Sequence, residues 1–269
     1  MQLRNGDGRP SVASRVLAIL DSFVPGATRL TLTDISRRSR LPLTTTHRLV
    51  AELVRLAVLE REDDSTYCVG VRLWEIGSRA PIRGGLRELA LPYMEDLYEA
   101  THENIQLAVL ADLEAMVIEK ISGRDSVRIV TRVGGRLPLH ATGVGKILLA
   151  HAPAEIIERV AAGALTRYAR NTIGERSRLL ADLELVRLRG YSVTHDEMTD
   201  GAMSVGAPVF GPAQTVVAAL SVVVDSRSGI PERLAPPVRT AARSLSRHVI
   251  DLWDRLRPAT SVPLAGSGG

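Results

Sequence analysis

The segment GVGK, residues 143–146, carries the glycines and the lysine of a phosphate-binding loop without the rest of that motif. A phosphate loop also needs glycine five positions before the second glycine of this segment, and Ser or Thr after the lysine. His140 and Ile147 stand there instead, so we reject nucleotide binding. A helix that begins near Thr142 or Gly143 would still offer free amide groups and a positive dipole to an anion or carboxylate. Glycines required only for tight packing are the open alternative.

His195, Asp196 and Glu197 are consecutive, and together they could hold a metal or transfer a proton. Consecutive loop residues point in different directions, however, and no second His or Cys group lies at ligand spacing. A hydrolase triad of Ser204, His195 and Asp196 lacks a nucleophile elbow. We therefore expect a solvated loop at 195–201, with no metal site, no cofactor and no catalytic residue.

Three hydroxyl side chains lie in or beside apolar segments that the pattern predicts to be strands. They are Thr194, Ser204 and Ser221. Each of them either satisfies the backbone or lines a pocket as a donor to a small ligand. The sequence alone leaves both interpretations open.

Residues 30–58 predict two short helices separated by a tight break. Thr33 is a suitable N-cap for the first helix, and Arg40-Leu41-Pro42 ends it. The second helix begins near Thr44 and has an apolar face formed by Leu49, Leu53 and Leu56. This arrangement fits a helix-turn-helix, whose second helix enters the DNA major groove. A helical hairpin buried in a core is the alternative.

The residues expected at DNA lie on both helices. Those expected to face the major groove are Thr44, Thr45, Thr46, His47 and Arg48. Among them Arg48 is the candidate for hydrogen bonds to a guanine edge. Those expected nearer the phosphates are Arg37, Arg38 and Arg40.

The neighbouring segments predict a complete winged domain. Ser11 or Ser14 would cap a first helix, whose apolar residues Val16, Leu17, Ile19, Leu20 and Phe23 would pack on the hairpin. Residues 58–69 predict a β-hairpin, which after a helix-turn-helix is a wing. Its turn is acidic and would repel phosphates. The wing would therefore touch DNA only through Arg61 or Thr66, or would only brace the fold.

The charge distribution favours a nucleic-acid module in the N-terminal part. Residues 1–80 hold 12 arginines against 9 acidic residues, so most of the net charge of +4 lies there, and an accidental imbalance of three charges is the alternative. Arginine outnumbers lysine 32 to 2, so Lys120 and Lys146 were retained either for a reason or by chance. A single cysteine, no signal peptide and no run of about 18 apolar residues predict a cytoplasmic protein without a membrane span.

The remaining chain predicts an α+β domain, one antiparallel sheet with helices packed on it. Helices are expected at 86–101, from about 143, and at 154–165, 176–190 and 231–257, and strands at 105–111, 115–121, 126–133, 191–194, 202–210 and 215–225. The domain boundary falls in a connector, 71–85, whose Leu73, Trp74 and Ile76 would pair with a second copy or pack on their own chain.

With these pieces in order, the chain from about Ser11 to Trp253 resembles the IclR family of bacterial transcriptional regulators. The resemblance is carried by SRVLAILDSF, LTDISRRSRLPLTTTHRLVAELVRLAVLER, YCVGVRLWEIG, RLPLHATGVGKILLA, GYSVTHDEMTDGAMSVGAPVF and VVAALSVVV. RLPLHATGVGK is the most specific of these sequences, because many families share a helix-turn-helix.

The resemblance implies a winged helix-turn-helix, a linker helix and a GAF-like effector-binding domain. The chain then divides into a disordered N-terminus (1–10), the DNA-binding domain (11–70), the linker helix (71–85), the effector-binding domain (86–257) and a flexible tail (258–269). It also implies homodimers, possibly tetramers, bound to a palindromic double-stranded DNA operator. Small organic acids or aromatic metabolites would tune that binding.

By motif, the family's effector pocket maps onto five residues of this chain. Gly143 and Val144 would offer backbone amides to a ligand carboxylate, and Thr194, Ser204 and Ser221 fall at pocket positions. The chain departs from the family in three places. Thr194 stands where some members have a carboxylate, Val223 where a second hydroxyl can follow, and Cys68 at a wing position that is often basic.

The leading hypothesis is therefore a ligand-responsive DNA-binding transcriptional regulator that is not an enzyme. The alternative is a small-molecule enzyme with an accessory helical domain. It would need converging acid and base groups, for which the sequence offers only His140 and His195 near plausible pockets. A constitutive architectural DNA binder would need no pocket at all.

Overall fold

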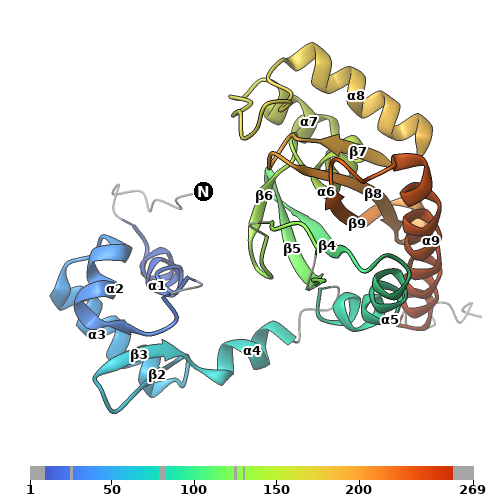
Figure 1. Cartoon of the computed structure of the whole chain (residues 1–269). Coiled ribbons are helices and arrows are strands. Elements are labelled where there is room, and N and C mark those ends of the chain that lie inside the picture. The colour runs from blue at the N-terminus through green and yellow to red at the C-terminus, as the bar shows by residue number, and fades with distance from the viewer. Residues whose placement is uncertain (1–9, 25–26, 79–82, 124–125, 130, 257–269) are drawn as a thin grey trace, which may run out of the picture. The chain divides into compact units, whose positions relative to one another are not determined.

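The chain divides into two compact units between Gly84 and Gly85 (Figure 1). The computed structural model describes residues 10–24, 27–78, 83–123, 126–129 and 131–256. The tails expected to be disordered, 1–10 and 258–269, lie outside the described residues except for Pro10. Each unit has its own core, so each is described by itself.

Three helices with a tight break between the second and third form most of the N-terminal unit. Helix α1 (Val12–Leu20) follows Ser11, whose hydroxyl accepts the Ser14 amide at 3.0 Å. Helix α2 (Leu32–Ser39) is capped by Thr31, not by Thr33 as expected, because the Thr31 hydroxyl accepts the Asp34 amide. Arg40 then adopts the left-handed conformation with φ 56°, and α3 (Leu43–Arg55) begins. The helix-turn-helix expected from the sequence is present.

The core of this unit is small and lies between the three helices. It is built on Ile19, Ile35, Leu49, Val50, Leu53, Leu30 and Leu59. Two residues expected in it are exposed instead: Leu17 is 57% and Leu56 42% accessible. On α3, Val50 is buried together with Leu49. The apolar stripe of a helix is wide enough to include two consecutive residues, so both face the core.

A three-stranded sheet completes the winged domain. Strands β2 (Leu59–Arg61) and β3 (Thr66–Val69) pair antiparallel as the expected hairpin. The sequence did not predict β1 (Leu30–Thr31), which pairs with the other edge of β3. Helix α4 (Val71–Ser78) follows within the expected linker and leaves Val71 and Ile76 exposed.

The C-terminal unit is built on one six-stranded sheet in the order β6-β5-β4-β9-β8-β7, with every neighbouring pair antiparallel. The strands are β4 (Asn104–Ala111), β5 (Glu114–Ile121), β6 (Arg136–Pro138), β7 (Ser192–His195), β8 (Ala202–Phe210) and β9 (Val216–Asp225). The order places the first and last strands of this unit, β4 and β9, side by side at the centre.

The strand expected at 126–133 is wrong. The described residues of this segment form no strand, and β6 pairs with the edge of β5 instead. Two side chains satisfy backbone carbonyls of the segment: the Asn104 amide donates to Val127 at 2.8 Å, and the Lys120 ammonium donates to Thr131 at 3.0 Å. Side-chain donors therefore replace part of the strand ladder that the apolar pattern predicted.

Helices cover both faces of the sheet (Figure 1). One face packs on α5 (Arg83–Thr101) and α9 (Pro231–Leu256), and the other packs on α6 (Gly143–Ala150), α7 (Ala154–Ala161) and α8 (Arg176–Arg189). The α+β architecture is as expected, although α7 ends at Ala161 rather than near residue 165. Among the described helices, none is both long and apolar enough to cross a membrane.

Candidate functional site

Helix α3 presents most of the polar residues expected at DNA on its exposed face. Thr44, His47 and Arg48 are exposed and Thr45 is half-buried. Thr46 is wrong as a base-contacting residue, because it is fully buried and its hydroxyl donates to the Pro42 carbonyl at 3.1 Å. Thr46 therefore fixes the start of α3 and does not face a groove.

The arginines of this unit differ in whether they already have a partner. Arg37 pairs with Asp34 at 2.7 Å, and Arg55 pairs with Glu52 in two hydrogen bonds on α3. Arg40 and Arg48 are exposed, and their side chains have no hydrogen bond or ion pair among the described residues. A free guanidinium has no internal ion pair to give up before it contacts a phosphate or a guanine.

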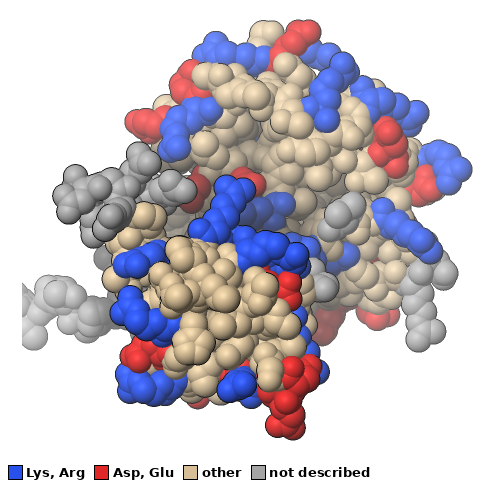
Figure 2. Space-filling model, turned by 90° about the vertical axis from the view of Figure 1, so that its left-hand side faces the viewer, with Lys and Arg blue, Asp and Glu red and all other residues tan. Residues whose placement is uncertain are grey.

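The wing turn remains acidic at its surface. Glu62 pairs with Arg29 at 3.0 Å, and Asp64 accepts bonds from the backbone amide and the hydroxyl of Thr66. The hydroxyl of Thr66 is thus engaged inside the turn. Figure 2 shows one face of the molecule, on which basic and acidic side chains both occur among uncharged surface.

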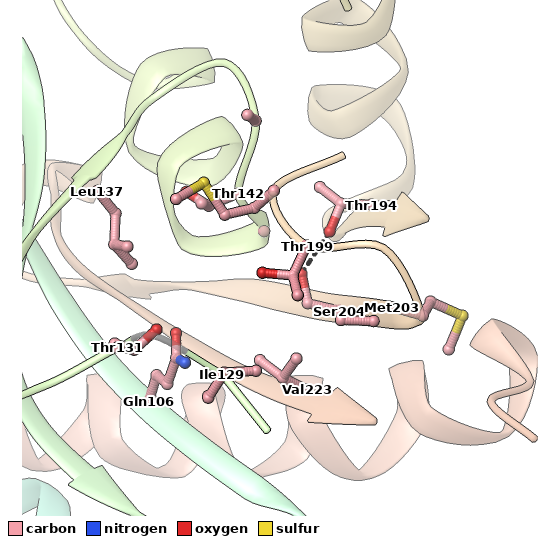
Figure 3. A pocket seen from close by; sticks show the side chains of 14 residues that line it. Gln106, Ile129, Thr131, Leu137, Thr142, Thr194, Thr199, Met203, Ser204 and Val223 are labelled. Carbon is pink, nitrogen blue, oxygen red and sulfur yellow. Dashed lines mark hydrogen bonds between the residues drawn. The ribbon is translucent and has the colours of Figure 1, made fainter. Parts of the chain in front are cut away.

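A pocket in the C-terminal unit lies between the sheet and the amino terminus of α6 (Figure 3). Its walls come from β4, β6, β7, β8 and β9, from the loop after β7 and from the segments on either side of β6. The lining residues are Gln106, Ile129, Thr131, Leu137, Ala141, Thr142, Gly143, Thr194, Met198, Thr199, Ala202, Met203, Ser204 and Val223. None of these side chains is ionisable, so the described lining offers apolar surface, hydroxyls and one amide.

The amino terminus of α6 supplies the polar end of this pocket. Thr142 caps the helix, since its hydroxyl accepts the Gly145 amide at 3.1 Å. Within the described part of the chain, no hydrogen bond uses the amides of Gly143 and Val144. These two amides and the helix dipole can bind an anionic group. Gly143 lines the pocket, whereas the Val144 side chain is buried in the core.

The three predicted hydroxyls do not occupy equivalent places. Thr194 and Ser204 face each other across β7 and β8 with their hydroxyl oxygens 2.6 Å apart, and both line the pocket (Figure 3). Ser221 is not a lining residue: it is buried, and its hydroxyl has no hydrogen-bond partner among the described residues. Val223, two positions along the same strand, faces the pocket instead.

Other lining residues escaped the sequence analysis. Gln106 offered a signal, because its amide interrupts the apolar segment 105–111 that the sequence predicts to be a strand. Met198 and Thr199 gave none, since nothing local in a loop shows that it closes a pocket formed by distant strands.

Gly143 fits only because it has no side chain. A Cβ at this position would lie 2.5 Å from the Ser204 hydroxyl oxygen. We expect Gly143→Ala to lower the free energy of unfolding by about 1–3 kcal/mol through overpacking, measured by urea denaturation. Gly174→Ala is the matched control, because a Cβ there meets nothing within 4 Å. Equal stability of the two variants would show that α6 is not pressed against β8.

The loop at 195–201 is not the solvated loop that we expected. His195 is exposed, but Asp196 is fully buried and Glu197 is 7% accessible. Burial opposes ionisation of Asp196, yet hydrogen bonds from Arg170 and the Gly201 amide hold its pKa below the usual value. Burial raises the pKa of Glu197, although Lys146 acts against this shift. Asp196 pairs with Arg170 and Glu197 pairs with Lys146, and neither of these cations is on a strand of the sheet.

The described residues do not converge on a catalytic or metal centre. The Nε2 atom of His140 lies 3.0 Å from the Thr166 carbonyl oxygen, and neither His140 nor His195 lines the pocket. Among the described residues there is also no group of three or more His, Cys, Asp or Glu side chains that could hold a metal ion. The pocket can therefore bind a small molecule but lacks a described acid or base to transform it.

A winged helix-turn-helix joined to an α+β unit with a small-molecule pocket defines a class of DNA-binding transcriptional regulators. Two family models match the chain: the IclR helix-turn-helix domain over residues 12–63, and the C-terminal domain of the bacterial transcriptional regulator IclR over 82–247. The chain belongs to the IclR family, as the sequence motifs predicted, and is a DNA-binding transcriptional regulator of that type.

Named relatives and solved structures extend over most of the chain. The regulator KipR of Bacillus subtilis is 30% identical over 237 residues, which cover 87% of this chain and 94% of KipR. An IclR homolog from Microbacterium hydrocarbonoxydans, solved in complex with 4-hydroxybenzoate, is 34% identical with a TM-score of 0.85, over 89% of this chain and 99% of that one. The Thermotoga maritima IclR structure is 26% identical with a TM-score of 0.71, over 88% and 98%.

Proposed function

We propose that a small organic acid or aromatic metabolite binds the pocket and changes the affinity of the regulator for a palindromic double-stranded DNA operator. The observation that carries the proposal is a pocket without charged lining at the free amino terminus of α6, in a unit separate from the helix-turn-helix. The amides of Gly143 and Val144 would bind a carboxylate, the hydroxyls of Thr194 and Ser204 would bind a polar substituent, and the apolar walls would hold the remainder.

The proposal places Arg48, His47, Thr44 and Thr45 at base edges, and Arg37, Arg38 and Arg40 at phosphates. Apolar side chains exposed on α1 and α4 support homodimers, which would match a palindromic site; these include Val12, Leu17, Val71 and Ile76. Tetramers would follow if the C-terminal units also pair. The protein would act in the cytoplasm, where bacterial DNA lies.

An enzyme is the weaker alternative. Acid–base catalysis requires a titratable group within hydrogen-bond reach of the substrate. The described pocket lining has none. Regulation by a ligand requires only that the ligand bind one arrangement of the protein better than another.

A thermal-shift screen of small carboxylic acids and aromatic metabolites tests the pocket, and 4-hydroxybenzoate is the first probe because a similar protein was crystallised with it. A ligand at 100 times its dissociation constant should stabilise the folded protein by about 2.7 kcal/mol. We expect Ser204→Ala to reduce the shift and Ser228→Ala, an exposed serine outside the pocket, to leave it unchanged. A ligand that stabilises both variants equally would place its site elsewhere.

A further inference from the structure

The only two lysines in the chain, Lys120 and Lys146, both bind segments that line the pocket. Neither lysine is itself a lining residue. The chain uses arginine at its 32 other basic positions, and both of its compact ammonium groups lie beside this one pocket. Each donates to an oxygen in, or next to, a wall of the pocket.

Lys146 lies between two carboxylates, of which Glu197 is buried and Asp182 is half-buried. Its side chain is 1% exposed, and its Nζ atom lies 2.7 Å from Oε1 of Glu197 and 2.8 Å from Oδ2 of Asp182. Lys146 is one turn beyond Gly143 on α6, while Glu197 immediately precedes Met198 and Thr199 in the loop. The pair with Glu197 therefore connects two walls of the pocket, the amino terminus of α6 and the loop.

The other bonds of the loop lead to segments other than α6. The backbone amide of Asn171 donates to the Asp196 carbonyl at 3.0 Å, and the Thr172 hydroxyl donates to the Glu197 carbonyl at 2.5 Å. At the other end of the loop, the backbone amide of Ser226 donates to the Gly201 carbonyl at 2.9 Å. Arg170 pairs with the Asp196 carboxylate. Within the described residues, Lys146 to Glu197 is the one hydrogen bond or ion pair that joins loop 195–201 to α6.

Lys120 makes the corresponding connection for another wall. It is half-buried on β5, and its Nζ atom donates to the Thr131 carbonyl at 3.0 Å. Figure 3 shows Thr131 beside Gln106, away from Thr199 and Ser204. The segment around Thr131 is not a strand, so this bond takes the place of a ladder bond.

We propose that Lys146 is a positioning residue of the pocket: through Glu197 it fixes the spacing between the amino terminus of α6 and the wall formed by Met198 and Thr199. Lys120 fixes the wall at Thr131 in the same way. The pair with Asp182 has a different role, since it attaches Lys146 to α8 and not to the loop. The expected effect of this spacing on ligand affinity rests on the proposed function. The expected effect on hydrogen exchange in the loop does not.

Hydrogen exchange of the full-length protein without ligand is the primary test, with Glu197→Ala and Asp182→Ala as a matched pair. Each variant leaves Lys146 with one carboxylate partner, but only Glu197→Ala releases the loop from α6. Because a hydrogen bond to a charged group is lost, amide exchange in 195–201 should become about tenfold faster in Glu197→Ala. Asp182→Ala should leave it unchanged, and the central strand β9 should exchange alike in both variants.

Glu197→Gln keeps an acceptor for Lys146 and should give an intermediate rate, which also guards against a folding defect in the alanine variant. Lys120→Met should speed exchange in the peptide that contains Thr131 and not in 195–201. Equal acceleration in Glu197→Ala and Asp182→Ala, or acceleration spread over β9 as well, would overturn the proposal, because both patterns indicate general loss of stability.

Calorimetric titration with 4-hydroxybenzoate separates this inference from the proposed function. If the protein binds the probe, Glu197→Ala should weaken binding about tenfold and Asp182→Ala should not; equal affinities in the two variants would refute the positioning role. If the protein does not bind the probe, 4-hydroxybenzoate is excluded as its effector. The exchange pattern then decides the positioning role alone.

Discussion

Arg48→Ala is expected to weaken binding to the specific operator by about 1–3 kcal/mol, roughly 5- to 150-fold. Arg48 is exposed on α3 and has no partner among the described residues, so its guanidinium can donate two parallel bonds to a guanine edge. Loss of these bonds should relax the preference for one base pair. The measurement is fluorescence anisotropy on an operator selected from random-sequence DNA, with single-base variants of that operator.

Arg37→Ala provides the comparison for this result. Arg37 is exposed on α2, outside the helix that we expect in the major groove, so we place it at a phosphate, where it would exchange its pair with Asp34 for the DNA backbone. Its loss should weaken specific and non-specific binding alike and lower the salt dependence, without changing base preference. If Arg48→Ala instead binds the selected operator as tightly as the wild type, Arg48 does not read bases.

Lys146→Met is expected to be the most destabilising of these substitutions, by about 3–5 kcal/mol in urea denaturation. It removes the cation from between Asp182 and Glu197 and leaves two carboxylates with no positive partner. Glu197→Ala and Asp182→Ala each leave Lys146 paired with one carboxylate, whereas Lys146→Met leaves two negative charges and no cation. The magnitude comes from the buried charge left behind and does not measure the strength of the ion triad that Lys146 forms with Asp182 and Glu197.

The loss of folding stability caused by Lys146→Met should become smaller at acidic pH. Burial raises the pKa of Glu197, and Lys146 opposes that shift in the wild type. Without Lys146 the pKa of Glu197 in the folded state should rise further above its unfolded value. The folded state then binds a proton more tightly, so the variant regains stability as the pH falls through that raised pKa.

Two controls separate this ion triad from charge loss in general. Arg176→Met breaks an exposed pair with Glu158 and should cost less than about 1 kcal/mol. Lys146→Met combined with Asp182→Asn and Glu197→Gln removes all three charges and should recover much of the stability. A Lys146→Met protein as stable as Arg176→Met would show that the Lys146 ammonium is hydrated and not buried.

The sequence predicted those elements whose signals are local. The strand at 202–210 has the predicted limits, and α6 begins at Gly143 as predicted, because an apolar run and a Thr cap are signals contained in a few consecutive residues. Gly190 ends α8 in the left-handed conformation, as a glycine after an apolar helix predicts. Family motifs added the domain architecture, which periodicity alone did not specify.

Most of the errors concern contacts between residues far apart in the sequence. Thr46 is the exception: it stands among exposed polar residues, but it is buried and its hydroxyl donates to the Pro42 carbonyl four positions earlier. Asp196 and Glu197 have the local pattern of a solvated loop, but Arg170 and Lys146 approach from other elements and make their burial possible. The segment 126–133 has a strand's composition, yet side chains of Asn104 and Lys120 satisfy its carbonyls.

Part of the candidate site followed from the family resemblance. Gly143, Thr194 and Ser204, which the resemblance assigns to an effector pocket, all line the pocket in this structure, and their contact with an effector stays a prediction. Ser221 lies beside the lining and not in it, because Val223 occupies the position nearest the pocket on β9. Ser221 and Val223 are two positions apart and therefore on the same face of the strand, so the sequence pattern does not show which of them lies nearer the pocket.

The measurement that tests the central claim most directly is operator affinity with and without the ligand found by thermal shift. The regulator should bind the selected palindromic operator in a salt-dependent way, and the ligand should shift the dissociation constant severalfold or more. Ser204→Ala should bind the operator normally but lose the response to the ligand. Identical operator affinity with and without a ligand that demonstrably occupies the pocket would contradict the claim that the pocket controls DNA binding.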